Sequence, residues 1–264
     1  LTPAAAQDGG GPVAFASFGF DPVPGHSVLV VPQVVIRRSA GQTWATVIGA
    51  GDVLRPAEPS TAAPAAIGYS DGSLSAAEWA DAVRDALVRI GRGDVAKVVL
   101  ARDLVATSEV VIDQRRLLLR LAERYPECWT FSVDGLVGAT PELLVRRRGD
   151  AVTSRVLAGT VRRLGDEAAD AAGAAAMQAS DKEVDEHRFA VQSVADALGE
   201  HCIELDVPAQ PRVLRLANVQ HLATDVSGRV ADGSTVLDLV QALHPTAAVC
   251  GTPTETALAL IREI

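Results

Sequence analysis

The feature that most constrains the fold is an amphipathic pattern at residues 179–202, which reads ASDKEVDEHRFAVQSVADALGEHC. Ser180 is followed three residues later by Glu183, which is the spacing of a capping box at the start of a helix. An apolar stripe then repeats at helical spacing and comprises Val184, Val191, Val194 and Leu198. The pattern therefore predicts a helix whose apolar side packs on a core.

A second stripe on the same helix places Glu186 above three small residues, Ala190, Ser193 and Ala197. Small side chains let another element approach closely. Acidic residues in the first turns are favoured by the helix dipole, so a solvated acidic helix start is one interpretation. The other interpretation is that Glu186 faces inward as a metal ligand.

Strand patterns dominate much of the remaining sequence. Runs rich in Val, Ile and Phe, separated by Pro, Gly and Ser signals, predict strands at 13–20, 27–37, 42–49, 95–107, 128–133, 136–138, 142–148, 151–157 and 213–226. Helical periodicity predicts helices at 75–90, 112–124, 166–178, 235–243 and 254–264. Many strands joined by hairpins, with helices set apart, predict an α+β fold with large antiparallel β-sheets in the core and helices packed outside.

Four segments have the composition of connections. Residues 1–12 predict a flexible lead-in, residues 21–25 and 39–41 predict hairpin-type turns, and residues 54–74, rich in Ala, Pro, Ser and Gly, predict a mobile loop.

The charge and cysteine content exclude several classes of protein. The net charge of −9 over 264 residues argues against nucleic acid or an anionic membrane as the main partner. Cys128, Cys202 and Cys250 are far apart and form no C-x-x-C motif, which fits a reducing cytoplasm better than a disulfide framework or a zinc site. No apolar run has the length of a membrane span, and no signal peptide is visible. An anionic substrate would then require local positive charge or a metal ion.

Two residues are candidates for acid–base chemistry. Lys97 lies in VAKVVLAR and shares a strand face with apolar neighbours, and burial there would favour its neutral, basic form. The alternative is an edge-strand lysine that extends its ammonium into water. Glu142 follows Thr140-Pro141 and precedes an apolar run; a carboxyl group in apolar surroundings has a raised pKa and can act as a general acid. A solvated turn glutamate is the alternative.

Three further residues are candidates for ligand contact. Gly159 would let a ligand approach the backbone, and Thr160 offers a hydroxyl and an N–H to an anion. His221 lies on an apolar strand, where a satisfied core histidine is the common alternative.

Six segments, taken in order, resemble the signature blocks of the chorismate-utilising enzymes: KVVLAR, GATPELLVRR, VLAGTVRR, S-x-K-x-x-x-E-H, NVQHLAT and HPTAAVCGTP. The resemblance runs from about residue 13 to residue 264. It implies a single chorismate-binding catalytic domain over residues 1–264, and we expect this sequence to lack the family's C-terminal segment, which supplies a second acidic ligand for Mg²⁺. Ala247 departs from the proline that the family often has in this loop.

Two positions point to one branch of the family. The resemblance places Lys97 where the anthranilate and aminodeoxychorismate branches usually have glutamine, and Ala158 where the aminodeoxychorismate branch typically has a nucleophilic lysine. The combination resembles a water-adding enzyme, closest to isochorismate synthase, an isomerase of menaquinone or siderophore biosynthesis. Salicylate synthase, anthranilate synthase component I and a non-catalytic family member are the alternatives.

The resemblance also implies roles for individual residues. Mg²⁺ is the expected cofactor, chorismate the expected small-molecule substrate, and a cytoplasmic monomer without nucleic-acid or membrane partners the expected state. The implied roles are catalytic base for Lys97, general acid for Glu142, Mg²⁺ ligand for Glu186, and substrate contacts for Gly159, Thr160, His221 and Ala248.

Overall fold

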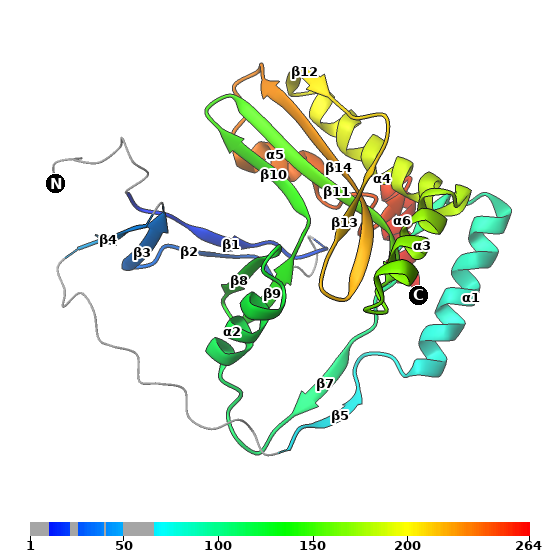
Figure 1. Cartoon of the computed structure of the whole chain (residues 1–264), viewed down its shortest axis with the longest axis horizontal. Helices are drawn as coiled ribbons and strands as arrows, with labels where there is room; N and C mark the ends of the chain where they lie inside the picture. Colours follow the sequence, from blue (N-terminus) through cyan, green and yellow to red (C-terminus); the bar gives the residue numbers. More distant parts are fainter. Residues whose placement is uncertain (1–10, 22–25, 40, 50–65) are drawn as a thin grey trace. The chain divides into compact units, whose positions relative to one another are not determined.

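A computed structural model describes residues 11–21, 26–39, 41–49 and 66–264 (Figure 1). The predictions made for residues 1–10 of the lead-in, for most of the 21–25 turn, for position 40 and for residues 54–65 of the loop lie outside these ranges.

Two compact units make up the chain. The first contains residues from Leu1–Ala63, Ile112–Glu123 and Thr130–Ala139, and the second contains Pro64–Val111, Arg124–Trp129 and Thr140–Ile264. Every candidate site residue belongs to the second unit. The single catalytic domain over residues 1–264 stays a prediction.

The elements alternate irregularly along the chain. The strands are β1 (Phe15–Ser17), β2 (Val28–Val30), β3 (Val34–Ser39), β4 (Gln42–Val47), β5 (Gly68–Asp71), β6 (Lys97–Val98), β7 (Leu104–Thr107), β8 (Trp129–Val133), β9 (Leu136–Thr140), β10 (Leu143–Arg148), β11 (Ala151–Arg162), β12 (Cys202–Asp206), β13 (Arg212–Arg215), β14 (Val219–Val230) and β15 (Gly251–Thr252). The helices are α1 (Ala76–Arg92), α2 (Gln114–Arg124), α3 (Glu167–Gln178), α4 (Asp181–Gly199), α5 (Val236–Leu243) and α6 (Thr254–Glu263).

The first unit is built from small antiparallel sheets. Strands β1 and β2 pair, as do β3 and β4. The single strand predicted at 27–37 is wrong, because Pro32, which has no N–H to donate to a ladder, separates β2 from β3. The strands predicted at 128–133 and 136–138 are confirmed and pair as a hairpin around Asp134-Gly135, where φ is 46° at Asp134 and 90° at Gly135, as a tight two-residue turn requires.

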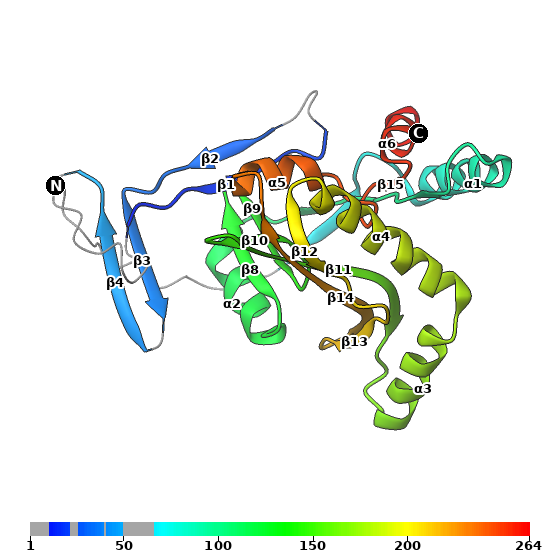
Figure 2. The ribbon, with the colours of Figure 1, turned by 90° about the horizontal axis from the view of Figure 1, so that it is seen from above.

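A five-stranded antiparallel sheet dominates the second unit, with the order β10-β11-β14-β12 and with β13 also paired to β14. Helix α4 runs along β11 and β14, and α5 packs beside it on β10 (Figure 2). The core between helices and sheet contains Val156, Ala190, Leu198 and Val226. The α+β class and the helix-covered antiparallel sheet predicted from the sequence are confirmed.

A β-bulge at Gly159 changes which way β11 faces. Ala158 pairs with Leu222, yet Thr160 pairs with His221, so Gly159 is one extra residue on β11. Gly159 has φ +75°, a conformation that glycine adopts without strain. Paired residues of an antiparallel sheet lie on one face, and faces alternate along a strand. The bulge therefore turns Thr160 to the face opposite Ala158, beside His221.

Helix α4 confirms its predicted core stripe only in part. Its buried residues are His187, Ala190, Val194 and Leu198, whereas Val184 is exposed. The first core position of the helix is therefore the histidine. The close approach predicted over the small residues is confirmed at Ala190, which is fully buried against the sheet.

Two other strand predictions are wrong in their extent. The strand predicted at 95–107 is interrupted between β6 and β7, where the Asp103 carboxylate turns back to accept hydrogen bonds from the backbone and hydroxyl of Ser73. The strand predicted at 213–226 is a hairpin, because β13 folds back on β14 through a turn at residues 216–218.

Three strands were not predicted, namely β5, β12 and the two-residue β15 that pairs with β6. Residues 68–71 of the predicted loop form β5, which has no apolar alternation and is ordered by pairing with β7. Strand β12, after α4, pairs with the far end of β14. Among the described residues, no helix has both the length and the apolar character needed to cross a membrane.

Candidate active site

Lys97 and Glu186 form an ion pair in the second unit. The strand β6 that carries Lys97 pairs with β15, where Thr252 lies opposite the lysine. Only 11% of the lysine side chain is exposed, and its Nζ lies 3.4 Å from Oε1 of Glu186 on α4. Within the described part of the chain, this buried ammonium has no hydrogen-bond partner. The prediction that Lys97 is withdrawn from water is confirmed, and Glu186 faces it, so the helix start is more than a solvated acidic turn.

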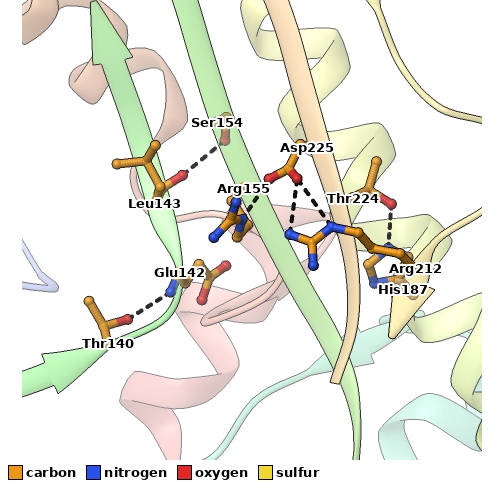
Figure 3. A network of polar contacts seen from close by, with 9 residues as sticks. All are labelled: Thr140, Glu142, Leu143, Ser154, Arg155, His187, Arg212, Thr224 and Asp225. Atoms are coloured by element: carbon orange, nitrogen blue, oxygen red, sulfur yellow. Dashed lines mark hydrogen bonds and ion pairs between the residues drawn. The ribbon is translucent and has the colours of Figure 1, made fainter. Parts of the chain in front are cut away.

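Glu142 lies in the bend between β9 and β10. Its backbone N–H donates to the Thr140 hydroxyl at 3.1 Å, which fixes the turn on either side of Pro141 (Figure 3). Burial raises the pKa of the Glu142 carboxyl group, while a hydrogen bond from the Leu157 backbone N–H and the charge of Lys97 act in the opposite direction. The predicted raised pKa of Glu142 is confirmed, and the lysine is close enough to affect it.

The bulge brings Thr160 and His221 together. The Thr160 hydroxyl lies 3.0 Å from Nδ1 of His221 across the β11–β14 ladder. Burial lowers the pKa of His221, partly offset by a hydrogen bond to the Gly159 carbonyl. His221 is therefore a polar group of the bulged region and not an isolated core histidine.

Two residues beside these positions were not predicted as functional. His187 is buried, with Nδ1 3.2 Å from the Ala158 carbonyl and Nε2 2.8 Å from the Thr224 hydroxyl (Figure 3). Burial lowers the pKa of His187, and the charge of Lys97 adds to this effect. Its register with Ala190 and the later core residues of α4 was the signal that could have found it.

Glu183 is the second. Its backbone N–H bonds to Ser180 as the capping box predicts, but its side chain does not return to the cap. The carboxylate pairs with Lys182 at 3.1 Å, and a Cβ placed on Gly159 would lie 3.2 Å from Glu183 Oε2. Glu183 therefore lies against the bulge.

Ala248 lies in the segment between α5 and β15 and packs against the core cluster that contains Ala158. The contacts of Glu142, His187 and Glu183 thus meet on residues 157–159 of β11, and Lys97 pairs with Glu186 on α4.

The carboxylates can be tested for their fit to Mg²⁺. Within the described ranges, no group of three or more His, Cys, Asp and Glu side chains could hold a metal ion. Mg²⁺, however, usually keeps several waters and takes one or two carboxylates together with oxygens of the substrate. The half-exposed carboxylate of Glu186 fits that kind of open site, in which the protein supplies few ligands.

In a comparison with known protein families, residues 2–264 match the family described as "Chorismate binding enzyme". The chain belongs to the chorismate-binding enzymes. MenF of Mycobacterium tuberculosis (strain ATCC 25618 / H37Rv) is 36% identical over 282 residues, which cover 99% of this chain and 70% of that protein. The isochorismate synthase DhbC of Bacillus subtilis (strain 168) is 38% identical over 199 residues, covering 71% of this chain and 50% of the relative.

Solved structures of chorismate-binding enzymes share the fold. DhbC from Bacillus anthracis superimposes with a TM-score of 0.78 at 31% identity. The match covers 96% of this chain and 64% of the DhbC chain. MenF from Escherichia coli, at 24% identity and a TM-score of 0.79, supports the fold alone. The chain thus spans 70% of the length of the first of these relatives and 50% of the second. The predicted chorismate-utilising enzyme fold is confirmed.

Proposed function

We propose that this chain carries the catalytic residues of an isochorismate synthase, an isomerase that interconverts chorismate and isochorismate. The observation that carries the proposal is the position of Lys97, a nearly buried lysine whose charge acts on Glu142 and whose ammonium pairs with Glu186. The naming of DhbC and several other relatives as isochorismate synthases supports the same branch.

Lys97 is the base of the proposed reaction. It removes a proton from a water molecule as the water oxygen bonds to C2 of chorismate. The ring double bonds shift and the bond from C4 to its hydroxyl breaks. A base at this position requires a lysine that can lose its proton, and Lys97 is a nearly buried lysine beside Glu186.

Glu142 is the acid. Burial raises its pKa, which favours the protonated form that an acid needs, and in the proposed step that proton passes to the C4 hydroxyl, which departs as water. Base and acid thus act at two carbons of the same ring, C2 and C4, and the protein regains its starting protonation when a proton passes back from Lys97 to Glu142 through solvent.

The remaining residues hold the substrate. Gly159 and Thr160 offer backbone and hydroxyl donors to a carboxylate, His221 orients the departing hydroxyl or a carboxylate, and Ala248 lines the pocket. Glu186 would hold Mg²⁺, which supplies charge neutralisation for the ring carboxylate of an anionic substrate. That chemistry accounts for how a protein with a net charge of −9 binds a dianion. A cytoplasmic location and a monomeric state remain predictions.

To test this, the protein, expressed at the length that the cell produces, is incubated with chorismate. One sample contains Mg²⁺ and the other a chelator, and the products are separated by chromatography. Isochorismate formed only with Mg²⁺ is the expected result. Salicylate together with pyruvate would assign the protein to the salicylate branch, and no turnover would contradict the proposal.

A further inference from the structure

His187 links three elements that carry the proposed site. It follows Glu186 on α4, its Nδ1 contacts the Ala158 carbonyl on β11, and its Nε2 contacts Thr224 on β14. A carbonyl oxygen can only accept, so Nδ1 carries the hydrogen and donates it. In the neutral ring Nε2 then accepts from the Thr224 hydroxyl, and both ring nitrogens are satisfied.

The bond to Ala158 reaches β11 where its ladder is disturbed. Ala158 immediately precedes the bulge at Gly159, and a bulge leaves backbone pairing locally disrupted. The imidazole supplies a donor from the helix at this point. It therefore ties the bulge to α4 at the residue next to Glu186.

We propose that His187 is a positioning residue that holds the Glu186 carboxylate and the Gly159 bulge in register with Lys97. The inference rests on the proposed function, because it assigns His187 to the same metal and substrate site. A helix can rotate or slide by a fraction of a turn against a sheet without losing its apolar contacts. A buried side chain with two directional hydrogen bonds removes that freedom, and outer-shell partners of this kind commonly tune a metal site.

Two substitutions separate the two bonds of the ring. In His187→Asn, the amide nitrogen takes the place of Nδ1 and can still donate to Ala158. In His187→Gln, the longer side chain places its amide near Thr224 and leaves the Ala158 carbonyl without its donor. The matched control is His201→Asn, since His201 lies beyond the other end of α4 and its Nδ1 bonds Asp232 at 2.8 Å.

The first measurement is the Mg²⁺ concentration for half-maximal isochorismate formation, together with KM and kcat for chorismate. We expect His187→Gln to raise the half-saturating Mg²⁺ concentration by about 10-fold, while His187→Asn and His201→Asn stay within about twofold of wild type. A general loss of packing would instead lower the melting temperature of both histidine variants without separating them in Mg²⁺ dependence, and that result would overturn the inference.

The second measurement does not depend on turnover. Crystal structures of the variants give the separation of Lys97 Nζ and Glu186 Oε1 and the φ angle of Gly159. We expect His187→Asn to keep that separation within about 0.5 Å of wild type and His187→Gln to exceed it. Unchanged geometry in His187→Gln would refute the positioning role, whereas wild-type protein without turnover would refute the proposed function and leave this geometric test intact.

If His187→Gln does not fold, the variant Thr224→Val tests the positioning role of His187 instead. It removes the hydroxyl that donates to Nε2 and nearly preserves the side-chain shape. A smaller rise in half-saturating Mg²⁺ in the same direction supports the inference, and wild-type Mg²⁺ dependence in this variant overturns it.

Discussion

The Lys97 ammonium and the Glu186 carboxylate lie 3.4 Å apart, one on a two-residue strand and the other on the second turn of α4. The lysine side chain is nearly buried, whereas the glutamate side chain is partly exposed. Their pairing joins the proposed base to the proposed metal ligand, so a substitution of either residue also removes the ion-pair partner of the other.

Replacing Lys97 tests the base. We expect Lys97→Ala to lower kcat by about 10²–10⁴-fold, the range that a general base contributes, with far-ultraviolet circular dichroism unchanged. Lys182→Ala is the control, because the Lys182 side chain is 82% exposed and pairs only with its neighbour Glu183 in the described structure. Turnover of Lys97→Ala at the wild-type rate would remove the assignment.

Replacing Glu142 tests the acid and also has a consequence for stability. Because burial raises the pKa of Glu142, the folded protein binds this proton more tightly than the unfolded chain does. Its contribution to stability is fully present below the unfolded pKa of about 4.3 and is lost as pH rises through the folded value. Glu142→Gln should therefore become more stable relative to wild type as pH increases from about 4 to 8, although it loses turnover. Denaturant unfolding of both proteins across this pH range measures the difference in stability. A difference that does not vary with pH would contradict the raised pKa of a buried Glu142 carboxyl group.

Gly159 and Gly165 form a matched pair for backbone strain. Both have positive φ, +75° and +81°, but an added Cβ meets Glu183 Oε2 at 3.2 Å and Leu222 Cδ1 at 3.3 Å only at Gly159. Gly165→Ala should cost about 1–2 kcal/mol of unfolding free energy from the left-handed conformation alone. Gly159→Ala should cost about 2–4 kcal/mol, since close contact adds to the strain. Equal losses in urea unfolding would show that the bulge has room for a side chain.

For Asp170, we predict that its contribution to stability depends on pH in the opposite direction to that of Glu142. Its buried carboxylate accepts from the Leu164 N–H at 2.7 Å and pairs with Arg163 at 2.9 Å, and these bonds lower its pKa, with the Leu164 bond as the largest cause. Its stabilisation is present above the unfolded pKa of about 3.9 and is lost as pH falls through the lower folded value. Asp170→Asn should lower the melting temperature at pH 7. In acid, the difference in melting temperature between this variant and the wild type should disappear. Glu167→Gln, which removes an exposed pair with Arg215, should change the melting temperature little at either pH.

The sequence predicted what depends on local pattern. The helix predicted from residue 75 begins with a complete capping box of Ser75 and Glu78, it ends at Gly93 in the left-handed conformation, and Gly135 in the β8–β9 turn has a positive φ. These features involve residues a few positions apart, so composition and spacing suffice to predict them.

The parts that the sequence did not predict depend on distant partners. Strand β5 has no apolar alternation and exists because β7 pairs with it. Arg163 pairs with Asp170 and donates to the Leu216 carbonyl, a partner that only the fold brings near. At the site, the resemblance to a family indicated which residues matter, but the roles of His187 and Glu183 as neighbours of the bulge required the register of β11 against α4.

The bulge at Gly159 also bears on how such a site could be gained or lost by insertion and deletion. Because Ala158 already pairs with Leu222 and Thr160 with His221, a chain without residue 159 could close the ladder with every other pair in place. We therefore expect a one-residue deletion here to be tolerated by the sheet while removing the Gly159 backbone group that we propose for substrate binding. From the substrate role that we propose for Gly159, we expect inherited length differences at this position to separate active members of a lineage from members that keep only the architecture.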